Sequence, residues 1–252
     1  MNPFKRFLLE LQEITFLITS AAFGLLKGPR YIKEMITNMD LIGVGSLPIV
    51  LLTGFFTGGV LILQTYPTLA YYSAQNEAGR SVALSLIREL GPVVTALLFA
   101  GRAGTSLTAE IGLMKAGEQL SAMEMMAIDP KARVLAPRFL AGLVSMPILA
   151  ILFSAVGILG AWVVAVLLIG VDAGNFWSIM QSGVDVWRDV GNGVVKSIAF
   201  GFICTFVALY QGYETQATPA GVAHATTRTV VIASLGVLST DFVLTALMFS
   251  TP

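Results

Sequence analysis

The sequence is poor in charged residues. Asp, Glu, Lys and Arg make up 12% of its 252 residues, whereas 56% of the residues are hydrophobic. The mean hydropathy is +0.81. Such a chain has too few polar side chains to cover the surface of a water-soluble domain of this length. The composition therefore predicts an integral membrane protein.

Side chains that serve metal, redox or nucleotide chemistry are equally scarce. The chain has one cysteine, Cys204, and one histidine, His224. A single cysteine in an apolar run cannot form a disulfide within the chain, and one histidine cannot supply a metal-binding cluster. The sequence also lacks the GxxxxGK[ST], HExxH and GxSxG motifs. We expect no catalytic residue, no metal site and no cofactor in this chain, with Cys204 buried and His224 at a helix end or the membrane interface.

The net charge excludes another class of partner. Fifteen basic residues are balanced by fifteen acidic residues. Binding to nucleic acid needs an excess of positive charge on one face. We therefore expect no nucleic-acid partner.

Long apolar runs make up most of the sequence. About 20 predominantly apolar residues are needed to cross the hydrocarbon core of a bilayer. Five stretches meet or approach this length, and the third is long enough for tilt or for a kink at Pro147. The predicted spans are approximately Leu41–Leu63, Val82–Ala103, Phe139–Val171, Val190–Tyr210 and Thr229–Phe249. No soluble domain interrupts them, so we expect a single domain over residues 1–252, with the spans within 41–250.

The basic residues are distributed unevenly between the two sides of this arrangement. Eleven of the fifteen lie in the N-terminal segment and in the connections 102–138 and 211–228. Lys and Arg are enriched in cytoplasmic loops. The distribution predicts a cytoplasmic N-terminus and, after five spans, a C-terminus on the opposite side.

The N-terminal segment, residues 1–38, begins with an amphipathic pattern. Its apolar residues recur at helical spacing, while charged residues occupy the other face. The apolar set is Phe4, Phe7, Leu8, Leu11 and Ile14. The pattern predicts a helix lying in the membrane interface. The alternative is a helix docked on the protein's own spans.

Two features within the spans suggest close helix contacts or a polar site. Gly54 and Gly58 form a small-xxx-small pair, which brings helices together within a chain or between two copies. Ionisable residues are costly in hydrocarbon and usually face a cavity or a partner. The candidates are Arg88, Glu89, Lys196 and Asp241. They indicate either a polar substrate cavity or interhelical ion pairs such as Glu89 with Lys196, and both interpretations can hold.

The connection between the second and third spans is predicted to be helical from about Ser106 to Ala127. Asp129 and Pro130 then supply a turn. A short amphipathic helix on the cytoplasmic face is suited to a partner's groove. The alternative is a surface helix packed on its own spans.

The motifs of this connection resemble a known family. GRAGTSLTAEIGLMKAGEQLSAMEMMAIDP followed by VLAPRFLA is similar to the signature of MlaE-type permeases. IRELGP at Ile87–Pro92 and TDFVLTALMF at Thr240–Phe249 fit the same pattern. These permeases are membrane subunits of ATP-binding-cassette systems that move phospholipids across the bacterial envelope and maintain outer-membrane lipid asymmetry.

The resemblance implies an assembly in the bacterial inner membrane. Two permease copies would form a homodimeric core and hold a phospholipid. The other partners would be an ATPase subunit (MlaF-like) that binds ATP and Mg, a STAS-domain protein (MlaB-like) attached to it, and a hexameric MCE-domain protein (MlaD-like) on the periplasmic side. The 106–127 helix would be the coupling helix, with Glu110, Lys115, Glu118 and Gln119 as ATPase contacts. Arg88, Glu89, Lys196 and Asp241 would line or gate the lipid cavity.

The expected protein is therefore an all-α permease that is driven by a separate ATPase and is not itself an enzyme. Two alternatives remain. The first is an ion-coupled transporter that uses Glu89, Lys196 and Asp241 as a relay. The second is a structural membrane anchor that recruits a complex through its cytoplasmic helix.

Overall fold

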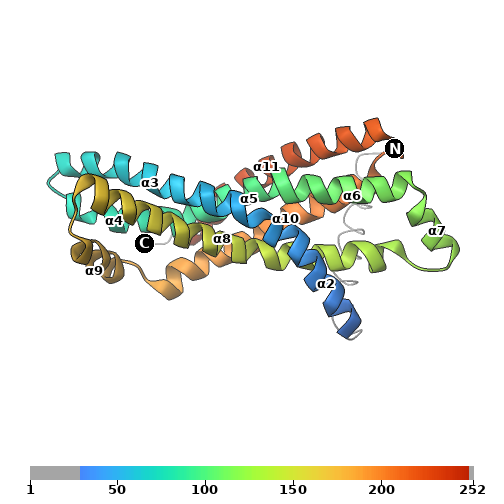
Figure 1. Cartoon of the computed structure of the whole chain (residues 1–252), viewed down its shortest axis with the longest axis horizontal. Helices are drawn as coiled ribbons and strands as arrows, with labels where there is room; N and C mark the ends of the chain where they lie inside the picture. The colour runs from blue at the N-terminus through green and yellow to red at the C-terminus, as the bar shows by residue number, and fades with distance from the viewer. Residues whose placement is uncertain (1–28, 250–252) are drawn as a thin grey trace. The chain divides into compact units, whose positions relative to one another are not determined.

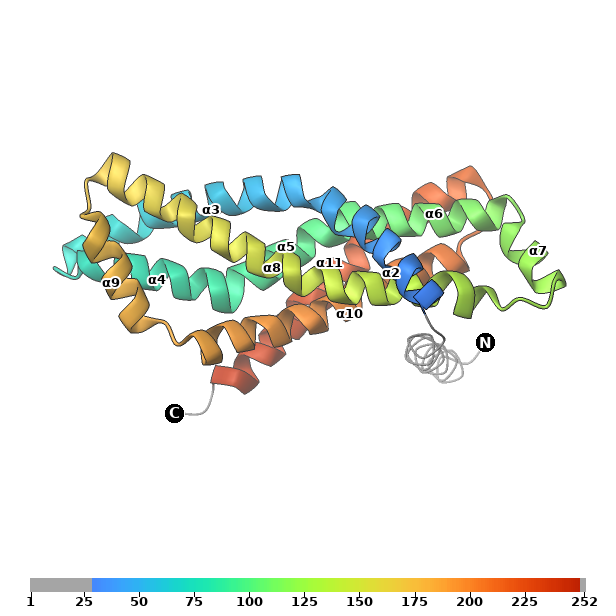
Figure 2. The same ribbon diagram turned by 60° about the horizontal axis from the view of Figure 1, so that its bottom comes forward.

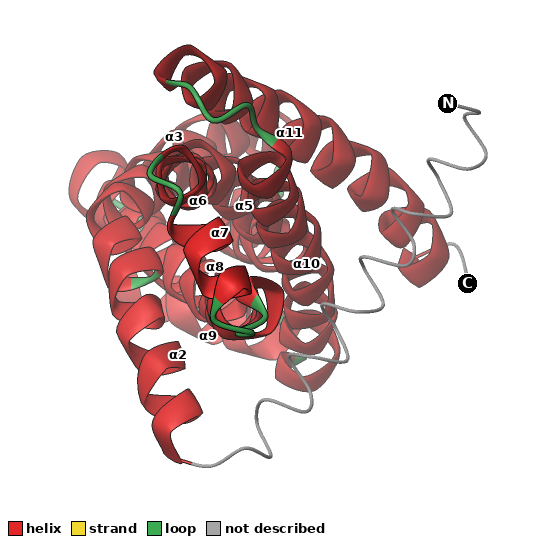
Figure 3. Ribbon diagram, turned by 90° about the vertical axis from the view of Figure 1, so that its right-hand side faces the viewer, coloured by secondary structure: helices red, strands yellow, loops and turns green. Residues whose placement is uncertain are grey.

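The computed structural model describes residues 29–249, and every regular element in this range is helical (Figure 1). Figure 3 shows short loops between the helices and no strand in this part of the chain. The elements in order are α2 (Pro29–Ile42), η1 (Val44–Ser46), α3 (Leu47–Tyr71), η2 (Gln75–Glu77), α4 (Ala78–Ser85), η3 (Leu86–Leu90), α5 (Gly91–Phe99), η4 (Ala100–Gly104), α6 (Thr105–Ala116), α7 (Gln119–Met125), η5 (Lys131–Leu135), α8 (Ala136–Val164), η6 (Ala165–Ile169), α9 (Ala173–Gly183), η7 (Val186–Val190), α10 (Gly191–Glu214) and α11 (Pro219–Phe249). The predicted all-α class is confirmed.

Within residues 29–249, five continuous helical runs are long and apolar enough to cross a membrane. They are Ile32–Tyr71, Gln75–Ala116, Lys131–Ile169, Val186–Glu214 and Pro219–Met248. The predicted number and order of spans are confirmed. The helical runs are mostly longer than the predicted spans because hydropathy locates the apolar centre, whereas backbone hydrogen bonding continues beyond it. Pro147 lies inside α8 without ending the helix.

The predicted N-terminal interfacial helix falls mainly on residues 1–28, which lie outside the described residues. The described part of the 1–38 segment belongs to α2. Glu34 of α2 forms an ion pair with Arg133 of η5, with Oε1 and Nη2 2.7 Å apart. This contact holds α2 against the segment that precedes α8.

The chain divides into two compact units, each built from three stretches of sequence. The first contains Met1–Gly45, Phe99–Ser145 and Gly201–Gly236. The second contains Ser46–Leu98, Met146–Phe200 and Val237–Pro252. Each long apolar helix contributes residues to both units.

In the first unit, buried hydroxyl groups join three helices. The Oγ1 atoms of Thr108 in α6 and Thr229 in α11 lie 2.8 Å apart. Thr108 Oγ1 also lies 3.0 Å from the carbonyl oxygen of Ala208 in α10. Interhelical hydrogen bonds of this kind stabilise apolar helix bundles. An apolar cluster packs nearby, consisting of Ile111, Leu120, Val134, Leu135, Ala136, Phe139 and Leu209.

In the second unit, glycines bring α3 and α8 into close contact. A Cβ atom added at Gly58 would collide with the carbonyl group of Gly157. A Cβ atom at Gly160 would collide with the carbonyl group of Phe55. A Cβ atom at Gly54 of α3 would likewise collide with the carbonyl oxygen of Phe153 in α8. The small-xxx-small pair Gly54 and Gly58 is therefore used within the chain, between the first and third spans.

The predicted single helix over 106–127 is two helices separated by a sharp turn. α6 ends at Ala116, and Gly117 and Glu118 precede α7. Glu118 has a φ of 58°, in the left-handed region. Helical periodicity continued across this turn, so the apolar pattern alone did not locate the break. Gly117 is the sequence signal for a helix end that the prediction overlooked.

The connection at 172–189 contains a further helix, α9, which was not predicted. Asp172 caps its N-terminus by accepting a hydrogen bond of 2.8 Å from the backbone amide of Asn175. Phe176 of α9 is buried, and its ring lies where a Cβ atom at Gly79 of α4 would be. Figure 2 shows α9 between the ends of α8 and α10.

Candidate functional site

A π-helical turn positions the first pair of charged residues. In η3, the amide of Gly91 bonds to the carbonyl oxygen of Leu86, five residues earlier. Pro92 has no N–H to donate to the carbonyl of Arg88, as a regular α-helix would require. The hydroxyl of Ser154 lies 3.2 Å from the Leu86 oxygen. The sequence Gly-Pro thus explains the wider turn that carries Arg88 and Glu89, and such turns are frequent at functional sites.

Arg88 forms a buried ion pair with Asp189 of η7. Its Nη2 and Nε atoms lie 2.6 Å and 2.8 Å from Asp189 Oδ1. The Arg88 side chain is 33% exposed, whereas that of Asp189 is 1% exposed. The second Asp189 oxygen accepts a hydrogen bond of 2.9 Å from the amide of Asp185. The carboxylate is therefore held by a guanidinium and a backbone amide, as a buried charge requires.

Lys196 lies completely buried between two carboxylates. Its Nζ atom is 3.0 Å from Asp241 Oδ1 and 3.9 Å from Glu89 Oε1. It also donates a hydrogen bond of 2.6 Å to Thr245 Oγ1. The side chains of Asp241 and Glu89 are 20% and 45% exposed. We call Lys196, Asp241, Glu89 and Thr245 the lysine cluster.

The structure brings three of the four predicted cavity residues together. Lys196, Glu89 and Asp241 share the lysine cluster, and Arg88 belongs to the separate pair with Asp189. The expected ion pair between Glu89 and Lys196 is present, although Asp241 is the nearer partner. Asp189 was not selected as a site residue. It precedes Lys196 on the same polar face of the Val186–Glu214 helical run. This polar face was the sequence signal that could have identified it.

The formal charges of these residues limit what the resting site can bind. Two cations, Arg88 and Lys196, face three carboxylates, those of Glu89, Asp189 and Asp241. Both cations already have carboxylate partners within 3.0 Å. An anionic ligand would therefore have to displace a carboxylate, which makes these pairs suited to switching between partners.

The predicted ATPase contacts separate into two groups. Glu110 is paired with Arg138 of α8, with Oε1 and Nη2 2.6 Å apart. Lys115 donates a hydrogen bond of 2.5 Å to the carbonyl oxygen of Tyr213 and lies over its ring. Glu118 and Gln119 are exposed at the turn between α6 and α7. Glu110 and Lys115 are therefore bound to neighbouring helices of the same unit, whereas Glu118 and Gln119 lie exposed at the turn.

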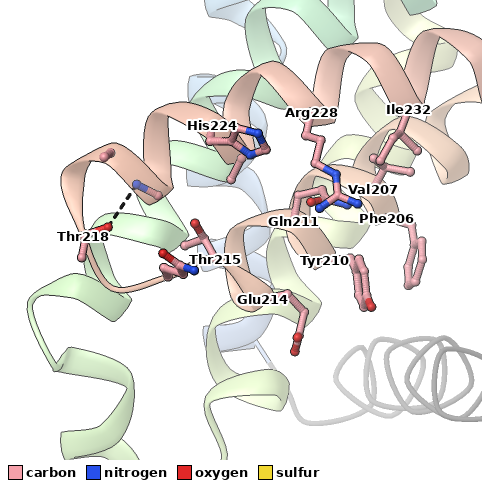
Figure 4. A pocket seen from close by; sticks show the side chains of 14 residues that line it. Phe206, Val207, Tyr210, Gln211, Glu214, Thr215, Thr218, His224, Arg228 and Ile232 are labelled. Atoms are coloured by element: carbon pink, nitrogen blue, oxygen red, sulfur yellow. Dashed lines mark hydrogen bonds between the residues drawn. The ribbon is translucent and has the colours of Figure 1, made fainter. Parts of the chain in front are cut away.

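A cavity of about 750 Å³ lies between α10 and α11 in the first unit (Figure 4). His224 and Arg228 lie one helical turn apart on α11, and Tyr210, Gln211 and Glu214 line the opposite side from α10. The sequence placed His224 at a helix end or the interface, and it lies in the second turn of α11. Arg228 was not predicted as a site residue.

The single cysteine lies in the apolar interior. Cys204 is buried, as predicted for a small apolar residue in an apolar run. Between residues 29 and 249, no group of three or more His, Cys, Asp or Glu side chains is arranged to hold a metal ion.

The fold and the buried charges define a multi-pass membrane protein with ion pairs between its spans. Residues 35–247 match the family described as Permease MlaE. The chain belongs to this family. It is 56% identical over 231 residues to the intermembrane phospholipid transport system permease protein MlaE of Haemophilus influenzae, covering 90% of this chain and 88% of the relative.

More distant relatives are similar over nearly the same share of this chain. A probable ABC transporter permease protein of Rickettsia typhi is 35% identical over 229 residues, covering 91% of this chain and 88% of the relative. The chloroplastic protein TRIGALACTOSYLDIACYLGLYCEROL 1 of Arabidopsis thaliana is 28% identical over 225 residues, covering 89% and 64%. The similarity thus spans all five apolar helices.

Proposed function

We propose that this chain is the permease subunit of an ATP-binding-cassette system that moves phospholipids between the bacterial inner membrane and periplasmic carriers. The observation that carries the proposal is 56% identity, over 90% of the chain, to a relative named for intermembrane phospholipid transport. The lysine cluster gives this permease a polar element inside apolar spans. Transport by such a system maintains outer-membrane lipid asymmetry.

The proposed assembly contains two copies of the chain, each a single permease domain with its N-terminus in the cytoplasm and its C-terminus in the periplasm. ATP and Mg bind to a separate ATPase subunit, and the chain itself is not an enzyme. A STAS-domain protein joins the ATPase, and an MCE-domain hexamer receives or delivers lipid. The N-terminal segment lies in the membrane interface.

Coupling is proposed to run through the turn between α6 and α7. Glu118 and Gln119 are exposed there and contact the ATPase. Glu110 and Lys115 act indirectly, since they fix α6 to α8 and α10 through Arg138 and Tyr213. Closure of the ATPase pair would move α6, which continues the second span. Arg88 and Glu89 lie in the same helical run and would move with it.

The lysine cluster and the Arg88–Asp189 pair act as gates in this proposal. When the lipid phosphate approaches, Arg88 or Lys196 exchanges a carboxylate for the phosphate oxygens, which are similar acceptors. The carboxylates hold the cations when no lipid is present. The apolar span surfaces accommodate the acyl chains.

The test is reconstitution of the chain with the proteins encoded beside it. Co-purification followed by mass spectrometry should identify an ATPase, an MCE-domain protein and enriched phospholipid. In proteoliposomes, transfer of a fluorescent phospholipid should require ATP. Transport by the isolated chain in a proton or sodium gradient would instead establish the ion-coupled alternative, and unchanged transport in a folded Lys196→Gln/Asp241→Asn variant would favour the anchor.

A further inference from the structure

The cavity between α10 and α11 changes from polar to apolar along its length. α10 and α11 are joined by a short connection, so the C-terminal end of α10 faces the N-terminal end of α11. Glu214, Thr218 and His224 line the cavity near this connection, whereas Phe206 and Ile232 line it further along the two helices. A ligand that fits this gradient has a polar head and an apolar tail.

Arg228 lies between the two ends of the cavity. Figure 4 shows its guanidinium directed towards α10, near Gln211, with His224 one turn away on the same side of α11. Among residues 29–249, no group forms a hydrogen bond or an ion pair with the side chain of Arg228 or His224. The guanidinium presents several donors in a planar fork that matches phosphate oxygens. Unlike Arg88 and Lys196, Arg228 has no carboxylate partner within the described range that an anion would have to displace.

Glu214 adds the opposite charge at the polar end. Its carboxylate would repel a purely anionic ligand, but it complements a ligand that carries an ammonium group beside its phosphate. The ring of Tyr210 also lines the cavity, and an aromatic face attracts an ammonium group. One cation and one carboxylate in a single cavity therefore favour a zwitterionic head group.

The size of the cavity agrees with a partly enclosed lipid. Its volume of about 750 Å³ lies within the usual range of roughly 300–1,000 Å³ for small-molecule sites. That space accommodates a head group and the first part of the acyl chains, and the remainder would extend along the apolar surface of α11. Val231 and Leu235 of this helix are 53% and 61% exposed.

We propose that this cavity binds a zwitterionic phospholipid from the leaflet on the side of the α10–α11 connection. Arg228 and His224 hold the phosphate, and Glu214 and Tyr210 hold the ammonium group. The inference rests on the proposed function in taking the ligand as a lipid, and it adds a second site, separate from the lysine cluster in the other unit.

The proposal is tested by photocrosslinking of the full chain in nanodiscs that contain phosphatidylethanolamine and phosphatidylglycerol. A benzophenone amino acid replaces Ile232 at the apolar end, and lipid adducts are counted by mass spectrometry of the intact protein. We expect phosphatidylethanolamine adducts that fall at least fivefold in Arg228→Gln. A Glu214→Gln variant should lose the preference for phosphatidylethanolamine over phosphatidylglycerol.

Two controls distinguish lipid binding in the cavity from general contact with the bilayer. Arg188→Gln removes an exposed arginine outside the cavity and should leave the adducts unchanged. The same probe at Leu235, which does not line the cavity, should react with lipid equally in Arg228→Gln and in the unmodified chain. Equal adduct yields at Ile232 with and without Arg228 would overturn the proposal. Displacement of the lipid by millimolar inorganic phosphate would also overturn it, because the site would then recognise free phosphate.

Failure of this proposal is distinguishable from failure of the proposed function. If Arg228→Gln loses the adducts but the complex still transports phospholipid with ATP, both the cavity and the transport function stand. If the unmodified complex does not transport lipid while the Arg228-dependent adducts persist, the site stands and the transport function fails.

Discussion

The ammonium group of Lys196 lies 3.0 Å from a carboxylate oxygen of Asp241, 45 residues away in the sequence. The lysine side chain is 0% exposed, and Thr245 and Glu89 provide its other polar neighbours. A buried charge without a partner is far more costly than a paired one. The ion pair with Asp241 and the hydrogen bond to Thr245 therefore link α10 to α11 within this unit.

Removal of the Asp241 carboxylate should destabilise the protein. In Asp241→Leu, Lys196 keeps the Thr245 hydroxyl at 2.6 Å and the more distant Glu89 carboxylate at 3.9 Å, and we expect a loss of roughly 3 kcal/mol in the free energy of unfolding. The double variant Lys196→Met/Asp241→Leu should recover most of the stability, because no buried charge remains, but lipid transfer should stay lost. Thermal unfolding in detergent and transfer in proteoliposomes measure the two effects. Full transfer by the double variant would exclude a gating role.

The Arg88–Asp189 pair should respond asymmetrically to neutralisation. Arg88→Gln leaves the Asp189 carboxylate, which is 1% exposed, without its guanidinium partner. This should lower the free energy of unfolding by roughly 3 kcal/mol. Asp189→Asn leaves Arg88, which is 33% exposed, able to reach polar surroundings, and should cost about 1 kcal/mol. Unfolding midpoints of the two single variants and the double variant measure this order. The reverse order would contradict the burial of the pair.

A methyl group at Gly58 should separate α3 from α8. The added Cβ would collide with the backbone of Gly157, and overpacking of this kind costs about 1–3 kcal/mol. Gly101→Ala is the matched control, because no atom of another described helix lies within 4 Å of its Cβ position. There the substitution should be neutral or stabilise the helix by up to about 1 kcal/mol. Unfolding curves of both variants in one detergent test the difference.

Two substitutions at Glu118 should separate backbone strain from contact. Glu118→Gly relieves a left-handed conformation with φ of 58° and should stabilise the turn by about 1 kcal/mol. Glu118→Lys keeps the strain and reverses the charge, so it should reduce ATPase co-purification and coupled ATP hydrolysis several-fold. Glu124→Lys places the same charge change on the exposed side of α7 and serves as the control. Normal coupling in Glu118→Lys would count against the assigned contact.

The sequence by itself determined the fold class, the five spans and their order. These depend on local properties, namely apolar runs of sufficient length and their interruption by polar segments. The same local reasoning found Arg88, Glu89, Lys196 and Asp241, because a charge in an apolar run is conspicuous whatever its partner.

Tertiary structure alone decided which of these charges meet. Sequence spacing relates residues on one helix, whereas Lys196 and Asp241 lie on different spans, and Asp189 became important only because η3 presents Arg88 to it. The break at Glu118 and the cavity around Arg228 also depend on backbone conformation and helix packing. Hydrophobicity fixes how long a membrane helix is, but side-chain packing and the pairing of buried charges fix which faces come together.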